Sequence, residues 1–129
     1  MTPRLGPSGH EDTFSRDRLP PFDRWPDLNM GDLDYPDRIN AAVELTDRMV
    51  GKGFGDSIAL IGNGRRRTYK ELSDWTNRLA RALVEDFGLR PGERVLIRSA
   101  NNPAMVACWL AATKAGAVAV NTMPPHLRF

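Results

Sequence analysis

The sequence predicts an α/β fold: a mixed, mostly parallel sheet with flanking helices and a β-hairpin. Three observations support this prediction. Stretches with helical and strand-like periodicity alternate between residues 37 and 129, which is typical of helices that cover a parallel sheet. The dipeptide Asn63-Gly64 separates two short strand-like runs and favours a type I′ hairpin turn. The chain has 129 residues, 41% hydrophobic and 26% charged, which suits one folded domain with a sizeable core.

A proline-rich arm is predicted at residues 1–36, ahead of a partial α/β domain at 37–129. Six of the ten prolines fall in the arm. Because proline lacks a backbone donor and has a fixed φ, we expect an extended arm that is without order to about residue 17. Its apolar residues are expected to lie on a protein surface; they are Phe22, Trp25, Leu28, Leu33 and Tyr35.

The first helix and the hairpin are predicted between residues 39 and 69. Apolar residues recur at three- and four-residue spacing from Ile39 to Val50, which indicates an amphipathic helix. The helix should end in the glycine-rich stretch 51–55. A short buried strand at 57–61 should then pair, through the Asn63-Gly64 turn, with a returning strand at 65–69.

Two more helices alternate with two more strands in the second half of the chain. Thr68 and Glu71 form the capping box of a helix with an apolar face at Leu72, Trp75, Leu79, Ala82 and Leu83, and Gly88 should end it. A strand follows at 95–97. Asn102-Pro103 then opens a helix at 104–114, which is apolar nearly all round and therefore expected to be buried. The last predicted strand spans 117–121.

Charge and composition exclude several classes of function. The net charge of +2 is too small to indicate nucleic acid or an anionic membrane as a partner. The single cysteine rules out an internal disulfide and a cysteine-based zinc site. No secretion signal is recognisable, and the longest apolar stretch, 104–120, is too short and interrupted to span a bilayer. We therefore expect a soluble, cytoplasmic protein.

Two stretches look like binding sites, and each has a simpler interpretation. A phosphate-binding loop lies between a strand and a helix, whereas residues 51–55 follow a helix and precede a strand, so a helix end and linker is predicted there. The three arginines Arg65, Arg66 and Arg67 alternate across a hairpin strand, with Arg66 on the opposite face. A solvated strand is the main interpretation, and a phosphate-contacting patch remains the alternative.

The single residues with chemical potential also have structural explanations. Cys108 lies in the most apolar helix, where a buried, inert thiol is expected. His10 and His126 have no carboxylate or cysteine at ligand or triad spacing. Trp25 is interpreted as an anchor of the arm, and Trp75 and Trp109 as core residues of helices. The capping box accounts for Glu71. No catalytic, cofactor-binding or metal-binding residue is predicted.

Two segments resemble core motifs of the adenylate-forming superfamily of acyl- and aryl-CoA synthetases, luciferases and peptide-synthetase adenylation domains. The first motif comprises Thr68-Tyr69-Lys70-Glu71-Leu72 with Trp75, Asn77, Leu79, Ala80 and Leu83. The second is residues 112–118, with Thr113 where leucine is usual. Residues 93–97 and 101–103 resemble the strand and helix start between them. The arm at 12–14, 19–21, 25–26 and 35–42 is similar to the N-termini of benzoate- and 2-aminobenzoate-CoA ligases.

The resemblance implies the leading part of the N-terminal domain of an AMP-forming acid–CoA ligase. Such an enzyme adenylates a carboxylic acid, here an aromatic one, with ATP and Mg²⁺, and then forms a thioester with coenzyme A. The family's phosphate loop, adenine motif, ribose-binding aspartate and catalytic lysine lie beyond residue 129, so no site residue is carried over. We expect a fragment that is inactive alone and binds none of these cofactors, in which both motifs serve packing, with homo-oligomers left open. The alternative is a stand-alone interaction or binding module without catalysis.

Overall fold

The computed structural model describes residues 8–26, 35–36 and 38–122. In chain order its elements are α1 (Phe14–Asp17), a 3-10 helix (Phe22–Arg24), α2 (Ala41–Leu45), α3 (Asp47–Met49), a π-helix (Val50–Phe54), β1 (Ile58–Gly62), β2 (Arg65–Thr68), α4 (Tyr69–Glu85), β3 (Arg94–Arg98), α5 (Pro103–Lys114) and β4 (Val118–Thr122). The predictions for Leu28, Leu33 and His126 lie outside the described residues. Residue 37 does too, and the domain boundary placed there stays a prediction.

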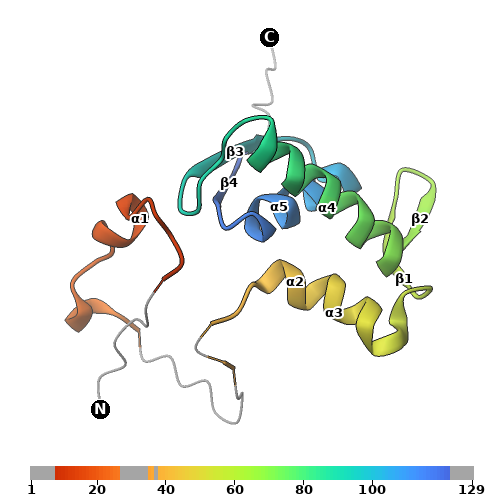
Figure 1. Ribbon diagram of the computed structural model, residues 1–129, viewed down its shortest axis with the longest axis horizontal. Helices are drawn as coiled ribbons and strands as arrows, with labels where there is room; N and C mark the ends of the chain where they lie inside the picture. Colours follow the sequence, from red (N-terminus) through yellow and green to blue (C-terminus); the bar gives the residue numbers. More distant parts are fainter. Residues whose placement is uncertain (1–7, 27–34, 37, 123–129) are drawn as a thin grey trace.

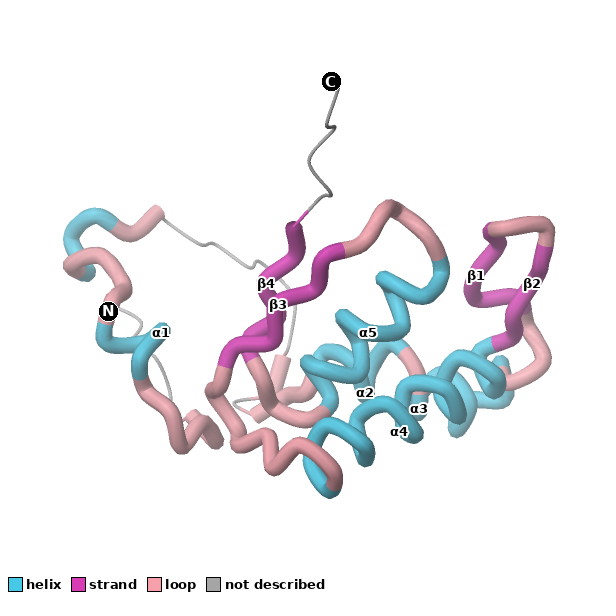
Figure 2. The backbone as a smooth tube through the Cα atoms, turned by 90° about the horizontal axis from the view of Figure 1, so that it is seen from above, coloured by secondary structure: helices cyan, strands magenta, loops and turns pink. Residues whose placement is uncertain are grey.

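The α/β class is confirmed, with the described strands divided between two small sheets. β1 and β2 form an antiparallel hairpin, and β3 and β4 form a parallel pair joined by α5. Helices α4 and α5 lie between the two sheets, with α2 and α3 running alongside them (Figures 1 and 2). The predicted type I′ turn is confirmed, since Asn63 and Gly64 both have positive φ, 52° and 70°.

The predicted helix starts are confirmed by their caps. Thr68 Oγ1 accepts from the Glu71 amide at 3.2 Å, and the Thr68 amide donates to Glu71 Oε2 at 2.8 Å, which completes the capping box of α4. Asn102 Oδ1 accepts from the Met105 amide at 2.9 Å, and Pro103 occupies the first turn of α5. Each cap satisfies amides that the first helical turn leaves without partners.

The first predicted helix is wrong in its continuity, whereas its end within the glycine-rich stretch 51–55 is confirmed. The run breaks at Thr46 (φ −127°, ψ −79°), whose hydroxyl donates back to the Ala42 carbonyl at 2.6 Å. The segment Val50–Phe54 is kinked at Gly53, whose φ of 90° and ψ of 6° are not helical. Glycine tolerates this φ because it has no Cβ, so Gly53 interrupts the helical path within the glycine-rich stretch.

The core is centred on the contact between α4 and α5. Its buried members are Ala42, Leu72, Ala107 and Leu110, with Ala59, Leu60, Trp75, Leu79 and Val106 packed against them. The expectation that α5 is buried all round is wrong, because Trp109 is 37% exposed and Ala104 is also exposed. Within the described ranges, no helix has the length and apolar character to cross a bilayer.

The described part of the arm is more ordered than predicted. Residues 14–17 form a helical turn, although we expected no order to about residue 17. Further along, the Phe22 and Trp25 rings stack at 5.3 Å, and Trp25 Nε1 donates to the Pro20 carbonyl at 2.8 Å. Aromatic stacking and local hydrogen bonds thus give this proline-rich stretch a defined shape.

Candidate functional site

The two motifs meet in a cluster of polar side chains that we call the polar junction. Its members are Asp47 at the start of α3, Ser73, Thr76 and Asn77 on α4, and Lys114 at the end of α5. Lys114 Nζ lies 2.6 Å from Asp47 Oδ2 and donates to Asn77 Oδ1 at 2.8 Å and Thr76 Oγ1 at 3.1 Å. These three acceptors match the three donors of an ammonium group, so the charge is fully paired.

Asp47 is held from several sides at once. Beyond Lys114, its carboxylate accepts from Thr46 Oγ1 at 2.9 Å, Ser73 Oγ at 3.0 Å and Asn77 Nδ2 at 3.3 Å. Burial acts to raise the pKa of Asp47, but the hydrogen bonds, led by that from Lys114, outweigh it and lower the pKa to about 2. The Lys114 side chain is only 9% exposed and that of Asp47 is 39% exposed. The junction therefore links three helices through a charge pair at the edge of the core.

Asn40 extends this linkage to α2. Its Oδ1 accepts from the amides of Ala42 and Val43 at 3.1 and 3.3 Å, which caps the start of α2. Its Nδ2 donates to the carbonyls of Thr113 and Lys114 at 3.1 and 3.2 Å, at the end of α5. One side chain thus satisfies groups at the termini of two helices.

The free energy of unfolding is expected to change with pH as Asp47 titrates. Because the folded pKa of about 2 lies below the reference value of 3.8, the ionised carboxylate adds stability above about pH 4, and this stability is lost as the pH falls towards 2. We expect the difference in unfolding free energy between wild type and Asp47→Asn to be largest above pH 4 and to shrink towards pH 2. Urea denaturation across this range measures it, and a difference that is independent of pH would contradict the assignment.

The contacts of the polar junction hold three helices together. The donors of Lys114 are matched by acceptors within the chain, and the Asp47 carboxylate accepts from four side chains. Ser73 and Thr76 are buried. Four members of this network were not predicted as site residues from the sequence: Asn40, Asp47, Ser73 and Thr76. The signal that was present is the polar set at 73, 76 and 77, whose three- and four-residue spacing places it beside the apolar face of α4.

Two kinds of site can be compared with the described side chains and backbone: a metal site and a glycine-rich phosphate loop. Among them, no three histidine, cysteine, aspartate or glutamate residues group together to hold a metal ion. The glycine-rich stretch follows a helical segment and leads into β1, so it does not place a helix N-terminus against a phosphate. We assign no step of a reaction to these residues.

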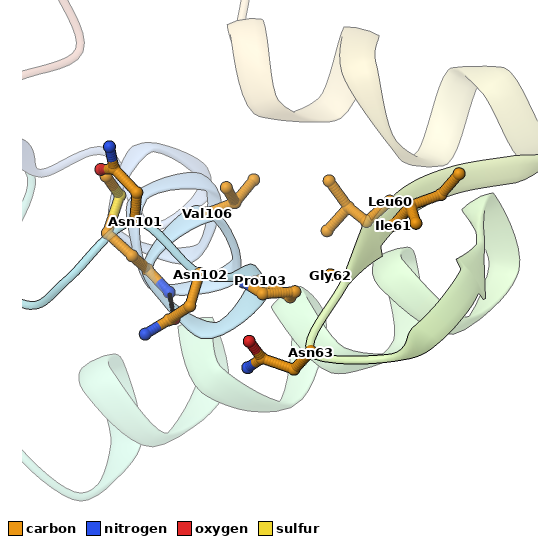
Figure 3. A pocket seen from close by; sticks show the side chains of 9 residues that line it. Leu60, Ile61, Gly62, Asn63, Asn101, Asn102, Pro103 and Val106 are labelled. Carbon is orange, nitrogen blue, oxygen red and sulfur yellow. Dashed lines mark hydrogen bonds between the residues drawn. The ribbon is translucent and has the colours of Figure 1, made fainter.

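A hollow of about 360 Å³ lies between the hairpin and the start of α5 (Figure 3). The hairpin side supplies residues 60–63, and the opposite side supplies 101–103 with Met105 and Val106. The elements meet closely here, since a Cβ on Gly62 would lie 2.7 Å from Pro103 Cγ. Asn102 already caps α5, so one of the amide side chains that line the hollow is engaged.

The remaining residues weighed from the sequence are dispersed. Arg65 and Arg66 are exposed, while the Arg67 guanidinium lies over the Trp75 ring, 4.5 Å from its centroid. Cys108 is half-buried rather than fully enclosed. Exposed His10 belongs to the N-terminal segment. Glu71 is held in the capping box, as predicted.

Comparisons with known proteins place this arrangement among its relatives. Residues 48–127 match the family model described as AMP-binding enzyme. The chain is 40% identical over 82 residues to 3-hydroxybenzoate–CoA ligase of Aromatoleum sp. (strain CIB), which covers 64% of this chain and 16% of that protein. It is 36% identical over 93 residues to benzoate–CoA ligase of Thauera aromatica, covering 70% of this chain and 18% of that protein.

A solved structure shows the same fold. The N-terminal subdomain of Klebsiella oxytoca NpsA, in complex with 3-hydroxyanthranilyl-AMSN, superposes with a TM-score of 0.59 at 30% identity, over 70% of this chain and 23% of that one. The described elements thus correspond to part of that subdomain. The chain spans less than a fifth of the length of the two curated relatives named above.

Proposed function

Because the chain belongs to the AMP-binding enzyme family, we propose that it forms the leading part of the N-terminal domain of an ATP-dependent, AMP-forming acid–CoA ligase. The proposed substrate is an aromatic carboxylic acid. The observation that carries the proposal is the match of one continuous segment to hydroxybenzoate- and benzoate-CoA ligases. Its support in structure is the likeness to an N-terminal subdomain solved with 3-hydroxybenzoyl-AMSN, at a TM-score of 0.57.

The proposed reaction converts the acid, Mg·ATP and coenzyme A into an acyl-CoA, AMP and pyrophosphate by way of an acyl adenylate. In our proposal the residues of this chain support the reaction by position alone. The polar junction holds the first motif against the second, with Lys114 donating to Asn77 at 2.8 Å. Rigid placement of supporting elements matters because reacting groups must be held close to their productive geometry. By itself the 129-residue chain is proposed to be inactive.

The proposal is tested on the protein that contains these residues, isolated from the cells that make it. We expect antibodies against the chain to capture a protein several times larger than 14.4 kDa. It should exchange pyrophosphate into ATP faster with benzoate or 3-hydroxybenzoate than with acetate. The purified 129-residue chain serves as control and should show no exchange. A captured product of 14.4 kDa without exchange would overturn the proposal in favour of an interaction module, and a preference for acetate would overturn the aromatic substrate.

A further inference from the structure

Residues 8–18, which we call the N-terminal strap, lie against the turn that precedes β3. The amides of Glu11 and Asp12 both donate to the Pro91 carbonyl, at 2.9 and 3.0 Å. At the next residue, a Cβ on Gly92 would collide with the Asp12 carbonyl oxygen. The strap and the turn are therefore in backbone contact, and a side chain at position 92 would block it.

Charge and one aromatic ring complete this contact. Arg94 Nη1 lies 2.6 Å from Asp12 Oδ2. The Phe14 ring meets two guanidinium groups, with centroid distances of 3.6 Å to Arg18 and 4.8 Å to Arg94. The hydrogen bond from Arg94, followed by that from the Phe14 amide, holds the pKa of Asp12 below its usual value. Arg94 thus binds both the acidic and the aromatic residue of the strap.

The contact has the character of a reversible one. The side chains of Arg94 and Asp12 are 38% and 24% exposed, and Phe14 is 47% exposed. None of the apolar residues in the buried core belongs to the strap. Exposed ion pairs and cation–π contacts are weak one by one and are screened by salt. Such an interface opens more readily than the core does.

We propose that the turn before β3 and Arg94 form a recognition surface for an acidic–aromatic segment, occupied by the chain's own strap through a salt-sensitive latch. The latch reaches the second motif through one further contact, because the Gly92 amide donates to the Gly116 carbonyl at 2.8 Å. Strap residues 8–10 and second-motif residues 113–117 also line a common pocket of about 840 Å³. Release of the strap removes one wall of that pocket and frees the turn that touches Gly116.

Hydrogen exchange of single amides in the 129-residue chain tests the latch. In wild type at low salt, the Glu11 and Asp12 amides should exchange more slowly than free peptide amides. Arg94→Gln should speed their exchange about tenfold, since it removes the ion pair and one cation–π contact. Raising the salt concentration from about 0.05 M to about 0.5 M should speed the exchange of these amides in wild type to a similar extent. The same change should alter their exchange in Arg94→Gln only slightly.

Arg98→Gln is the matched control, because Arg98 is an exposed arginine at the other end of the same strand. It should leave the exchange of both strap amides unchanged. Amides within α4 report that each variant is folded and should not change. Exchange of Glu11 and Asp12 at the free-peptide rate in wild type would overturn the proposal. Equal protection of the two amides in wild type and Arg94→Gln at the low salt concentration would overturn it as well.

Discussion

Replacing Leu110 by alanine is expected to lower the free energy of unfolding by about 2–4 kcal/mol. Leu110 is 4% exposed and lies with Leu72, Ala107 and Ala42 at the centre of the core. The substitution removes buried apolar surface and leaves a cavity between α4 and α5, which stiff neighbouring helices fill only in part. Urea denaturation followed by circular dichroism measures the loss.

Leu96→Ala is the control for this prediction. The side chain of Leu96 is 67% exposed on β3, so its truncation should change the unfolding free energy by less than about 0.5 kcal/mol. Both variants remove the same side-chain atoms, so the difference between their losses of unfolding free energy reports how deeply each leucine is buried. Equal losses for the two leucines would show that the core is centred elsewhere.

Replacing Lys114 by methionine is expected to lower the free energy of unfolding by about 1–3 kcal/mol. Methionine keeps most of the length of the side chain but removes the donor to Asp47, Thr76 and Asn77. Breaking a buried charge pair is costly because the partner charge stays behind; the 39% exposure of Asp47 reduces that cost below the value for a fully buried pair. Equilibrium unfolding of both proteins in urea gives the difference.

A double-mutant cycle identifies the partner of Lys114. If the two charges interact directly, Asp47→Asn combined with Lys114→Met should cost clearly less than the sum of the two single changes. Lys70→Met is the matched control, since Lys70 is exposed on α4. It should leave stability within about 0.5 kcal/mol of wild type. Additive costs for the pair would mean that the junction does not act as a unit.

The helix starts and the hairpin turn were predictable because each depends on residues three or four positions apart. The capping box needs only Thr68 and Glu71, and the type I′ turn needs only Asn63 and Gly64. The family resemblance was also readable from two motifs, and the match over residues 48–127 confirmed it.

The break at Thr46 was not predictable from periodicity. A threonine hydroxyl either faces solvent or bonds back to the preceding turn, and neighbouring elements decide which. Here Thr46 is buried, and its one hydroxyl hydrogen is shared between the Ala42 carbonyl and the Asp47 carboxylate, which is also paired with Lys114 from α5. The helical pattern in the sequence was right, but tertiary contacts interrupted it.

By itself, then, the sequence determined the local elements and the family, since short-range hydrogen bonds, turn conformations and apolar spacing are properties of neighbouring residues. Only the tertiary structure decided the polar junction, the docking of the strap and the division of the strands into two sheets. These depend on residues that are distant in the chain, such as Asp47 with Lys114 and Asp12 with Arg94. The packing of the helices decides which polar side chains come into contact, because no local rule relates positions that are far apart in the chain.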